Sequence, residues 1–160
     1  MDLTQLEADR LMAMDKVAME VRQYHFPTPG KKLEIPLVSR DEKERFTFSI
    51  YRGKRSVLKC TYQELHGGQC VLVRLDLNGP KHTNPQVLLP PEGFDEYNGT
   101  EFTESHLHLY VEGYDDKWAL PASDKGFIEV SEMSHLSENL MKFLDFCNVR
   151  AALDIIGVLI

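Results

Sequence analysis

The sequence predicts an α+β domain: an antiparallel meander sheet of five or six strands, with an N-terminal helix and one or two C-terminal helices packed on one face. Three observations predict it. Apolar residues first recur at helical spacing, then alternate with polar residues in short runs, and finally return to helical spacing. Short turns containing glycine separate most of the runs, as in consecutive hairpins. A length of 160 residues fits a single domain.

Two segments are predicted to be helical. The first covers residues 5–23, because Thr4 and Glu7 form a capping-box pattern and apolar side chains follow at helical spacing. The segment 27–30, Pro-Thr-Pro-Gly, ends this helix. The second helix covers residues 134–147. The apolar tail, 151–160, is compatible with a helix, although Gly157 and the β-branched residues leave its structure open.

Six strands are expected, over residues 32–39, 45–52, 56–64, 69–78, 105–111 and 117–121. A long irregular loop, residues 79–104, interrupts them. Loops of this length are uncommon in compact domains unless they are functional or disordered. The single domain, 1–160, therefore divides into an N-terminal helix and turn (1–30), the sheet (31–121) and a C-terminal helical part (122–160).

Alternation along these strands assigns the side chains to two faces. The apolar face collects Phe46, Phe48, Ile50, Leu58, Cys60, Tyr62, Val71, Val73, Leu75, Leu77, Leu107, Leu109 and Val111. The polar face collects Arg45, Thr47, Ser49, Tyr51, Lys59, Thr61, Gln63, Arg74, Asp76, Asn78, His106, His108 and Tyr110, with Val57 and Leu72 as exceptions. We expect the helices to cover the apolar face. Trp118 is expected to cap the core, the alternative being an exposed platform for a nucleic-acid base.

The polar face carries the residue types of phosphodiester chemistry. His106 and His108 are candidates for general acid and base, because imidazole titrates at about pH 6.5. Arg74 and Lys59 are candidates for binding phosphate. The loop would deliver His82, and Tyr110 is a further catalytic candidate. These residues predict a small, toxin-like ribonuclease that needs no cofactor and binds RNA on a basic sheet face.

Two other interpretations of the same residues stay open. His106 and His108 lie on one side of a strand, and His82 with Asp76 completes four ligands for a divalent metal such as zinc. Alternatively, the histidines and Tyr110 pack beneath the long loop as hydrogen-bonded, inert groups, or belong to a simple ligand-binding site.

Charge is distributed unevenly along the chain. Residues 31–82 carry eleven basic and six acidic side chains, whereas residues 92–160 carry four basic and fourteen acidic ones. The net charge of −7 argues against a protein that coats nucleic acid over its whole surface. The two halves either complement each other or serve a second function: a non-catalytic module of a mobile element or defence locus that binds a basic protein through its acidic half and the 79–104 loop.

Several classes of protein are disfavoured. The sequence contains no apolar run of the roughly 20 residues needed to span a bilayer. Its polar, acidic start is not that of a secretory signal. The three cysteines, Cys60, Cys70 and Cys147, form no C-x-x-C pair, which disfavours a disulfide framework and fits a cytoplasmic location.

Four segments carry a resemblance to a known family. They read LTQLEAD at residues 3–9, RLDLNGPKHTNP at 74–85, HLHLYVEGYDDKWALP at 106–121 and FCN at 146–148. Together they resemble an uncharacterised family of small bacterial and prophage proteins, a domain of unknown function. The resemblance spans nearly the whole chain and implies no particular activity. It places Arg74, Asp76, His82, Asn84, His106, His108 and Tyr110 in the signature segments of that family.

Overall fold

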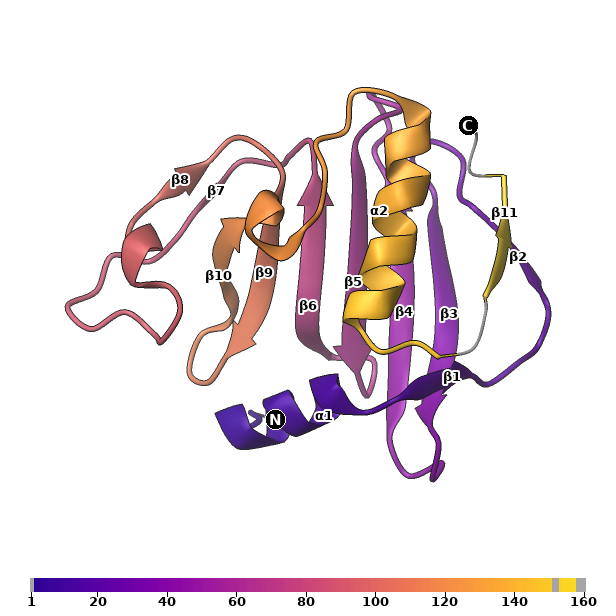
Figure 1. The fold of residues 1–160 in the computed structure, drawn as a ribbon, viewed down its shortest axis with the longest axis horizontal. Coiled ribbons are helices and arrows are strands. Elements are labelled where there is room, and N and C mark those ends of the chain that lie inside the picture. The colour runs from indigo at the N-terminus through magenta and orange to yellow at the C-terminus, as the bar shows by residue number, and fades with distance from the viewer. Residues whose placement is uncertain (1, 151–152, 158–160) are drawn as a thin grey trace.

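The computed structural model describes residues 2–150 and 153–157. Its main sheet has seven strands in the order β1-β3-β4-β5-β6-β9-β10, and every neighbouring pair is antiparallel. These strands are β1 (Lys16–Ala18), β3 (Lys32–Ser39), β4 (Arg45–Arg52), β5 (Cys60–His66), β6 (Cys70–Leu77), β9 (His106–Val111) and β10 (Asp115–Pro121). Helix α2 (Met133–Phe146) lies over one face, and α1 (Gln5–Ala13) lies across one end of the strands (Figure 1). The predicted α+β class and antiparallel sheet are confirmed, with seven strands instead of five or six.

The seventh strand comes from the segment predicted to continue the first helix. The capping box of Thr4 and Glu7 is present, but α1 ends at Ala13 and Met14 is extended, with φ −66° and ψ 139°. The chain then forms β1, in which Val17 pairs with Val38 of β3. The prediction of a helix over 5–23 was wrong beyond Ala13, because residues 16–18 pair with β3, a strand distant in the sequence.

Two small sheets complete the fold. β2 (Gln23–His25) pairs in parallel with β11 (Asp154–Ile156), so the predicted C-terminal helical part includes a strand. Residues 151–152 and 158–160 of the tail lie outside the described residues. Within the predicted irregular loop, β7 (His82–Thr83) pairs with β8 (Glu101–Phe102). Together with the 3₁₀ helix η1 (Asp95–Tyr97), they form a lobe beside β10 (Figure 1).

The apolar core lies between the sheet and α2. Leu136, Leu140 and Phe143 of α2 are buried, and the Phe143 ring packs on Phe48 and Tyr62. The Tyr62 hydroxyl donates a 2.8 Å hydrogen bond to the Leu136 carbonyl. The predicted C-terminal helix and its packing on the apolar face are thus confirmed. Among the described residues, no helix is long and apolar enough to cross a membrane.

A β-bulge changes one predicted side-chain assignment. The register of β5 and β6 shifts between Glu64 and Leu65, which gives β6 one extra residue there. Leu72, predicted on the polar face, is consequently buried in the core. Trp118 is also fully buried, between Phe94 and Tyr114, as expected of a residue that caps the core. It is therefore not a stacking platform for a base.

Candidate functional site

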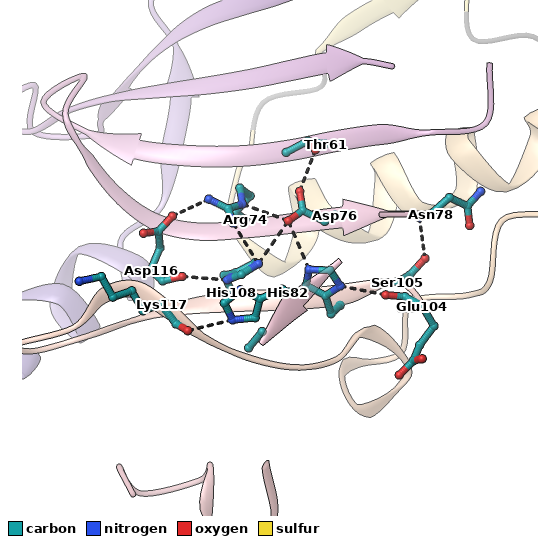
Figure 2. A network of polar contacts seen from close by, with 12 residues as sticks. Thr61, Arg74, Asp76, Asn78, His82, Glu104, Ser105, His108, Asp116 and Lys117 are labelled. Atoms are coloured by element: carbon teal, nitrogen blue, oxygen red, sulfur yellow. Dashed lines mark hydrogen bonds and ion pairs between the residues drawn. The ribbon is translucent and has the colours of Figure 1, made fainter. Parts of the chain in front are cut away.

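Strand register brings the predicted polar residues into two cross-strand rows. The first row contains Lys32, Tyr51, Thr61, Asp76 and His106, and the second contains Glu34, Ser49, Gln63, Arg74 and His108. Directly opposite residues in antiparallel strands have neighbouring side chains. Asp76 therefore faces His106, and Arg74 faces His108. Figure 2 shows Arg74, Asp76 and His108 on the side of the sheet opposite α2.

The Asp76 carboxylate is the centre of the site. Its Oδ1 accepts a 2.8 Å hydrogen bond from Thr61 Oγ1. Its Oδ2 lies 3.4 Å from His106 Nε2 and 3.2 Å from His108 Nε2. Asp76 is 2% exposed and both imidazoles are fully buried. The three side chains thus converge on one point within the protein, where Figure 2 shows Asp76 beside His108.

Backbone carbonyls determine which nitrogen of each imidazole carries a proton. His106 Nδ1 lies 2.8 Å from the Glu104 carbonyl, and His108 Nδ1 lies 2.8 Å from the Asp116 carbonyl. Because a carbonyl oxygen only accepts, both Nδ1 atoms must donate. In the neutral rings, both Nε2 lone pairs are then directed toward Asp76. Among the described residues, His106 Nε2 has no hydrogen-bond partner.

Arg74 supplies positive charge beside the carboxylate. Its Nη1 donates a 2.6 Å hydrogen bond to Asp116 Oδ2, while Nε lies 3.2 Å from Asp76 Oδ2. Its Nη2 lies 3.0 Å from His108 Nε2 and donates to it when the ring is neutral. Burial alone would raise the pKa of Asp76, but Arg74, Thr61 and the hydrogen bonds that the two imidazoles donate when their Nε2 atoms are protonated together hold it well below its ordinary value. The buried carboxylate is therefore ionised.

His82 covers the cluster from the β7–β8 lobe. Its ring centroid lies 4.4 Å from that of His108 and 5.8 Å from that of His106. His82 Nε2 is 3.0 Å from Asn84 Oδ1 and 2.9 Å from the Lys117 carbonyl, so this nitrogen donates. Burial, and then the neighbouring His108, lower the pKa of His82. A neutral ring therefore closes the solvent side of the site.

Asn84 anchors the lobe that holds His82. Its amide donates to the carbonyls of Tyr97 and Ala119, at 2.9 and 2.8 Å, and its Oδ1 accepts from the Ala119 amide. Asn84 is 3% exposed, so these are buried hydrogen bonds. The sequence placed Asn84 in a signature segment, but no local pattern could show that it joins the loop to β10.

Two predicted site residues lie outside the cluster. The Tyr110 hydroxyl donates to the Leu3 carbonyl at 2.6 Å and accepts from the Leu3 amide at 3.0 Å, so it tethers the N-terminal segment. Lys59 lines an open groove beside Asp76 and Arg74. The structure thus brings together Asp76, Arg74, His82, His106 and His108 without Tyr110. Thr61 and Asp116, which complete the hydrogen bonding, were not among the predicted site residues.

The cluster has the chemistry of a metal-binding site. One ligand atom from each of Asp76, His106 and His108 lies within 4.8 Å of the other two. His82 Nε2, the fourth predicted ligand, is instead directed at Asn84 and Lys117. Imidazole and carboxylate ligands together suit divalent transition metals such as zinc. Asp76, His106 and His108 are therefore the residues able to hold an ion.

A second buried charge lies on the opposite face of the sheet. Glu64 and Lys16 are both fully buried, with Lys16 Nζ 3.3 Å from Glu64 Oε2. Lys16 also donates to the carbonyls of Cys147 and Met12. Sequence analysis missed this pair, although Glu64 occupies an inward position in the alternation of Cys60 and Tyr62. Burial raises the pKa of Glu64 to about 7, although Lys16 acts in the opposite direction.

Comparisons with known proteins identify a family but no activity. No curated protein and no solved structure matches the chain. The model of a family of unknown function, DUF6978, matches residues 3–149. This match covers nearly the whole chain, including the strands and the lobe that build the cluster, and agrees with the resemblance seen in the sequence. The chain therefore belongs to the DUF6978 family.

Proposed function

We propose that this protein binds a divalent transition-metal ion, with Zn²⁺ as the reference ion, through Asp76 Oδ2, His106 Nε2 and His108 Nε2. The observation that carries the proposal is the convergence of the two Nε2 atoms on one carboxylate oxygen while both Nδ1 atoms donate to carbonyls. Metal-binding histidines usually donate their other ring nitrogen in this way, which orients the ring and selects its tautomer.

The distances suit such an ion. Zinc bonds of about 2.0–2.2 Å in a tetrahedron place neighbouring ligand atoms about 3.3 Å apart. Asp76 Oδ2 lies 3.4 Å from His106 Nε2 and 3.2 Å from His108 Nε2. Without an ion or an added proton, the His106 lone pair is directed at a carboxylate, which is unfavourable in a buried site.

Arg74 must give way when the ion binds. Its Nε and Nη2 contact Asp76 Oδ2 and His108 Nε2, the same atoms that would ligate metal. Its 2.6 Å contact with Asp116 would remain. Arg74 therefore serves as the counter-ion of Asp76 in the metal-free protein and as a competitor for the incoming ion.

The burial of the imidazoles favours metal binding over the predicted metal-independent nuclease. A general acid or base must come within hydrogen-bond reach of its substrate. His106 and His108 are fully buried, and the His82 ring lies over them. Metal binding requires only that an ion, and not a phosphodiester substrate, reach the buried imidazoles. The ribonuclease activity and the binding of a basic protein through the acidic half remain predictions.

The test is metal uptake by tag-free protein that has been stripped with a chelator. We expect one Zn²⁺ per chain by elemental analysis, and visible d–d absorption of bound Co²⁺ that Zn²⁺ bleaches. His106→Asn and His108→Asn should abolish both signals, because asparagine can replace the Nδ1 donor but not the Nε2 ligand. Asp76→Asn should weaken binding strongly, since it removes the only anionic ligand.

His135→Asn is the matched control, because His135 lies on α2, away from the cluster. This variant should bind metal like the parent protein. Failure of the folded parent to take up Zn²⁺ or Co²⁺ would overturn the proposal and leave the cluster a structural network of Arg74, Asp76 and the imidazoles. Uptake that survives His106→Asn and His108→Asn would also overturn it.

A further inference from the structure

The two cross-strand rows that contain Asp76 and Arg74 continue toward β3, and at that end the polar face is open to solvent. Helix α2 covers the opposite face of the sheet, and the β7–β8 lobe lies at the β10 edge (Figure 1). Between β3 and β6, the polar face forms a groove of about 470 Å³. Lys32, Tyr51, Lys59, Gln63, Arg74 and Asp76 line it, and the Asp76 carboxylate is 2% exposed and contacts Arg74. The exposed surface of the groove therefore combines cationic, amide and aromatic groups.

The cations at this groove are available for a ligand. Lys54 and Arg55 lie in the turn between Gly53 and Lys59, which borders the groove. Among the described residues, Lys54, Arg55 and Lys59 form no ion pair, whereas Lys32 pairs with Glu34 at 3.4 Å. An anionic ligand would thus meet Lys59 in the groove, and Lys54 and Arg55 in the turn at its border, without displacing a protein carboxylate from any of the three.

The backbone holds Lys59 in place. A Cβ added to Gly53 would lie 2.9 Å from Lys59 Cβ, so the stem of this lysine packs directly on the glycine. On its other side, a Cβ at Gly79 would lie 3.9 Å from Lys59 Cε. The Gly53 amide also donates to the Lys59 carbonyl at 2.8 Å. The stem of Lys59 is therefore positioned by close contact with Gly53.

Tyr51 adds an exposed aromatic ring between the cations. It is 45% exposed and pairs with Lys32 on one side and Thr61 on the other. Proteins that bind single-stranded nucleic acids combine a cationic groove with aromatic rings on which bases stack. A duplex would present its phosphates here, but its paired bases would not be free to stack on Tyr51.

We propose that this groove binds a single-stranded nucleic acid, with a base stacked on Tyr51 and phosphates contacting Lys54, Arg55 and Lys59. The inference goes beyond the proposed metal centre and does not require it, because none of these four residues is a proposed metal ligand. The net charge of −7 does not oppose it, since residues 31–82 carry eleven basic and six acidic side chains.

The experiment measures fluorescence anisotropy of labelled oligouridylate and oligothymidylate over a salt series, in excess chelator. A labelled blunt-ended duplex is the comparator. We expect the single strands to bind more tightly than the duplex. Tighter binding of oligouridylate than of oligothymidylate would identify RNA as the ligand, and the reverse order would identify DNA.

Three variants locate the binding surface. The triple variant Lys54→Gln/Arg55→Gln/Lys59→Gln should reduce the slope of log affinity against log salt by about 2, at roughly 0.7 per lost phosphate contact. Tyr51→Ala should weaken binding about 5- to 150-fold, the usual range for one lost base stack, whereas Tyr51→Phe should retain it. Gly53→Ala should weaken binding by displacing the Lys59 stem.

Lys142→Gln is the control for lost charge, because Lys142 lies on α2. It should leave affinity unchanged. The inference is overturned if neither single strand binds at low salt, if the triple variant behaves like Lys142→Gln, or if binding appears only when Zn²⁺ is added. The last result would leave the metal proposal intact, whereas failed metal uptake would leave this inference intact.

Discussion

Asp76 and Glu64 are two carboxylates of one sheet that experience opposite environments. Asp76 is 2% exposed and Glu64 is fully buried. Asp76 lies on the polar face, in a row with Thr61 and His106, whereas Glu64 pairs across the sheet with Phe48 and Val73. The contacts of Asp76 hold its pKa well below the ordinary value, but burial raises that of Glu64 to about 7.

The number of polar neighbours accounts for the difference. Both oxygens of Asp76 are engaged: Thr61 donates to Oδ1 and Arg74 donates to Oδ2, while each imidazole Nε2 faces Oδ2 and donates to it when protonated. Glu64 has Lys16 on Oε2, and Oε1 has no hydrogen-bond partner among the described residues. Similar burial thus stabilises a charge on one face and penalises it on the other, because only one face supplies enough donors.

Removing the partner of Glu64 should have the largest effect. Lys16→Met should destabilise the protein by about 3–5 kcal/mol above neutral pH, because it leaves a buried carboxylate without a counter-ion. Urea unfolding measures this loss. The double variant Lys16→Met/Glu64→Leu should recover most of the stability. If Lys16→Met unfolds at the same urea concentration as the parent, the pair does not compensate its charges in the manner described.

The second-largest effect should be the contribution of Glu64 to the pH dependence of stability. Its folded-state pKa of about 7 exceeds the ordinary 4.5, so the folded protein holds this proton more tightly than the unfolded chain. Stability from this group is therefore present below about pH 4.5 and is lost as pH rises through 7. Relative to Lys16→Met/Glu64→Leu, the unfolding free energy of the parent should fall by roughly 3 kcal/mol across this range. Parallel curves for the two proteins would contradict the prediction.

Removing the charge of Asp76 should lower the unfolding free energy, whereas removing the charge of Glu64 by protonation raises it. Asp76→Asn should destabilise the metal-free protein by about 2 kcal/mol, because Arg74 loses its buried anionic partner. Urea unfolding in excess chelator tests this without a contribution from bound ion. Equal or greater stability of Asp76→Asn would show that the surrounding donors do not stabilise the carboxylate.

The smallest effect should come from the single hydrogen bond to Asp76 Oδ1. Thr61→Val keeps the side-chain shape and should cost about 1 kcal/mol by losing the 2.8 Å contact. Thr47→Val is the matched control, because Thr47 lies on the neighbouring strand of the same sheet. Thermal unfolding of the two variants should separate them. Identical transitions would mean that this hydrogen bond does not contribute to stability.

Strand periodicity was sufficient to predict much of the site. Alternation placed Arg74, Asp76, His106 and His108 on one face, and the structure brings them into contact. It also predicted six strands of the main sheet. Alternation did not exclude Tyr110, which contacts Leu3 instead, because neither the position of the N-terminal segment nor its hydrogen bonds can be deduced from local spacing.

The two errors in secondary structure near the chain ends share one physical cause, which is pairing between distant segments. The region 14–18 has apolar residues compatible with a helix, yet its backbone gains hydrogen bonds to β3 as strand β1. Residues 154–156 form β11 because β2 offers them a parallel partner. In both segments, tertiary hydrogen bonds override a weak local preference.

By itself, the sequence determined which side chains share a face, because successive residues of a strand point in opposite directions. Only the tertiary structure decided which of them meet. Register set Asp76 against His106, the lobe anchored by Asn84 brought His82 over the imidazoles, and carbonyls of Glu104 and Asp116 oriented both rings. Apart from the contact between Glu104 and His106, which are two residues apart, these contacts join separate segments, so their geometry depends on the packed fold and not on local periodicity.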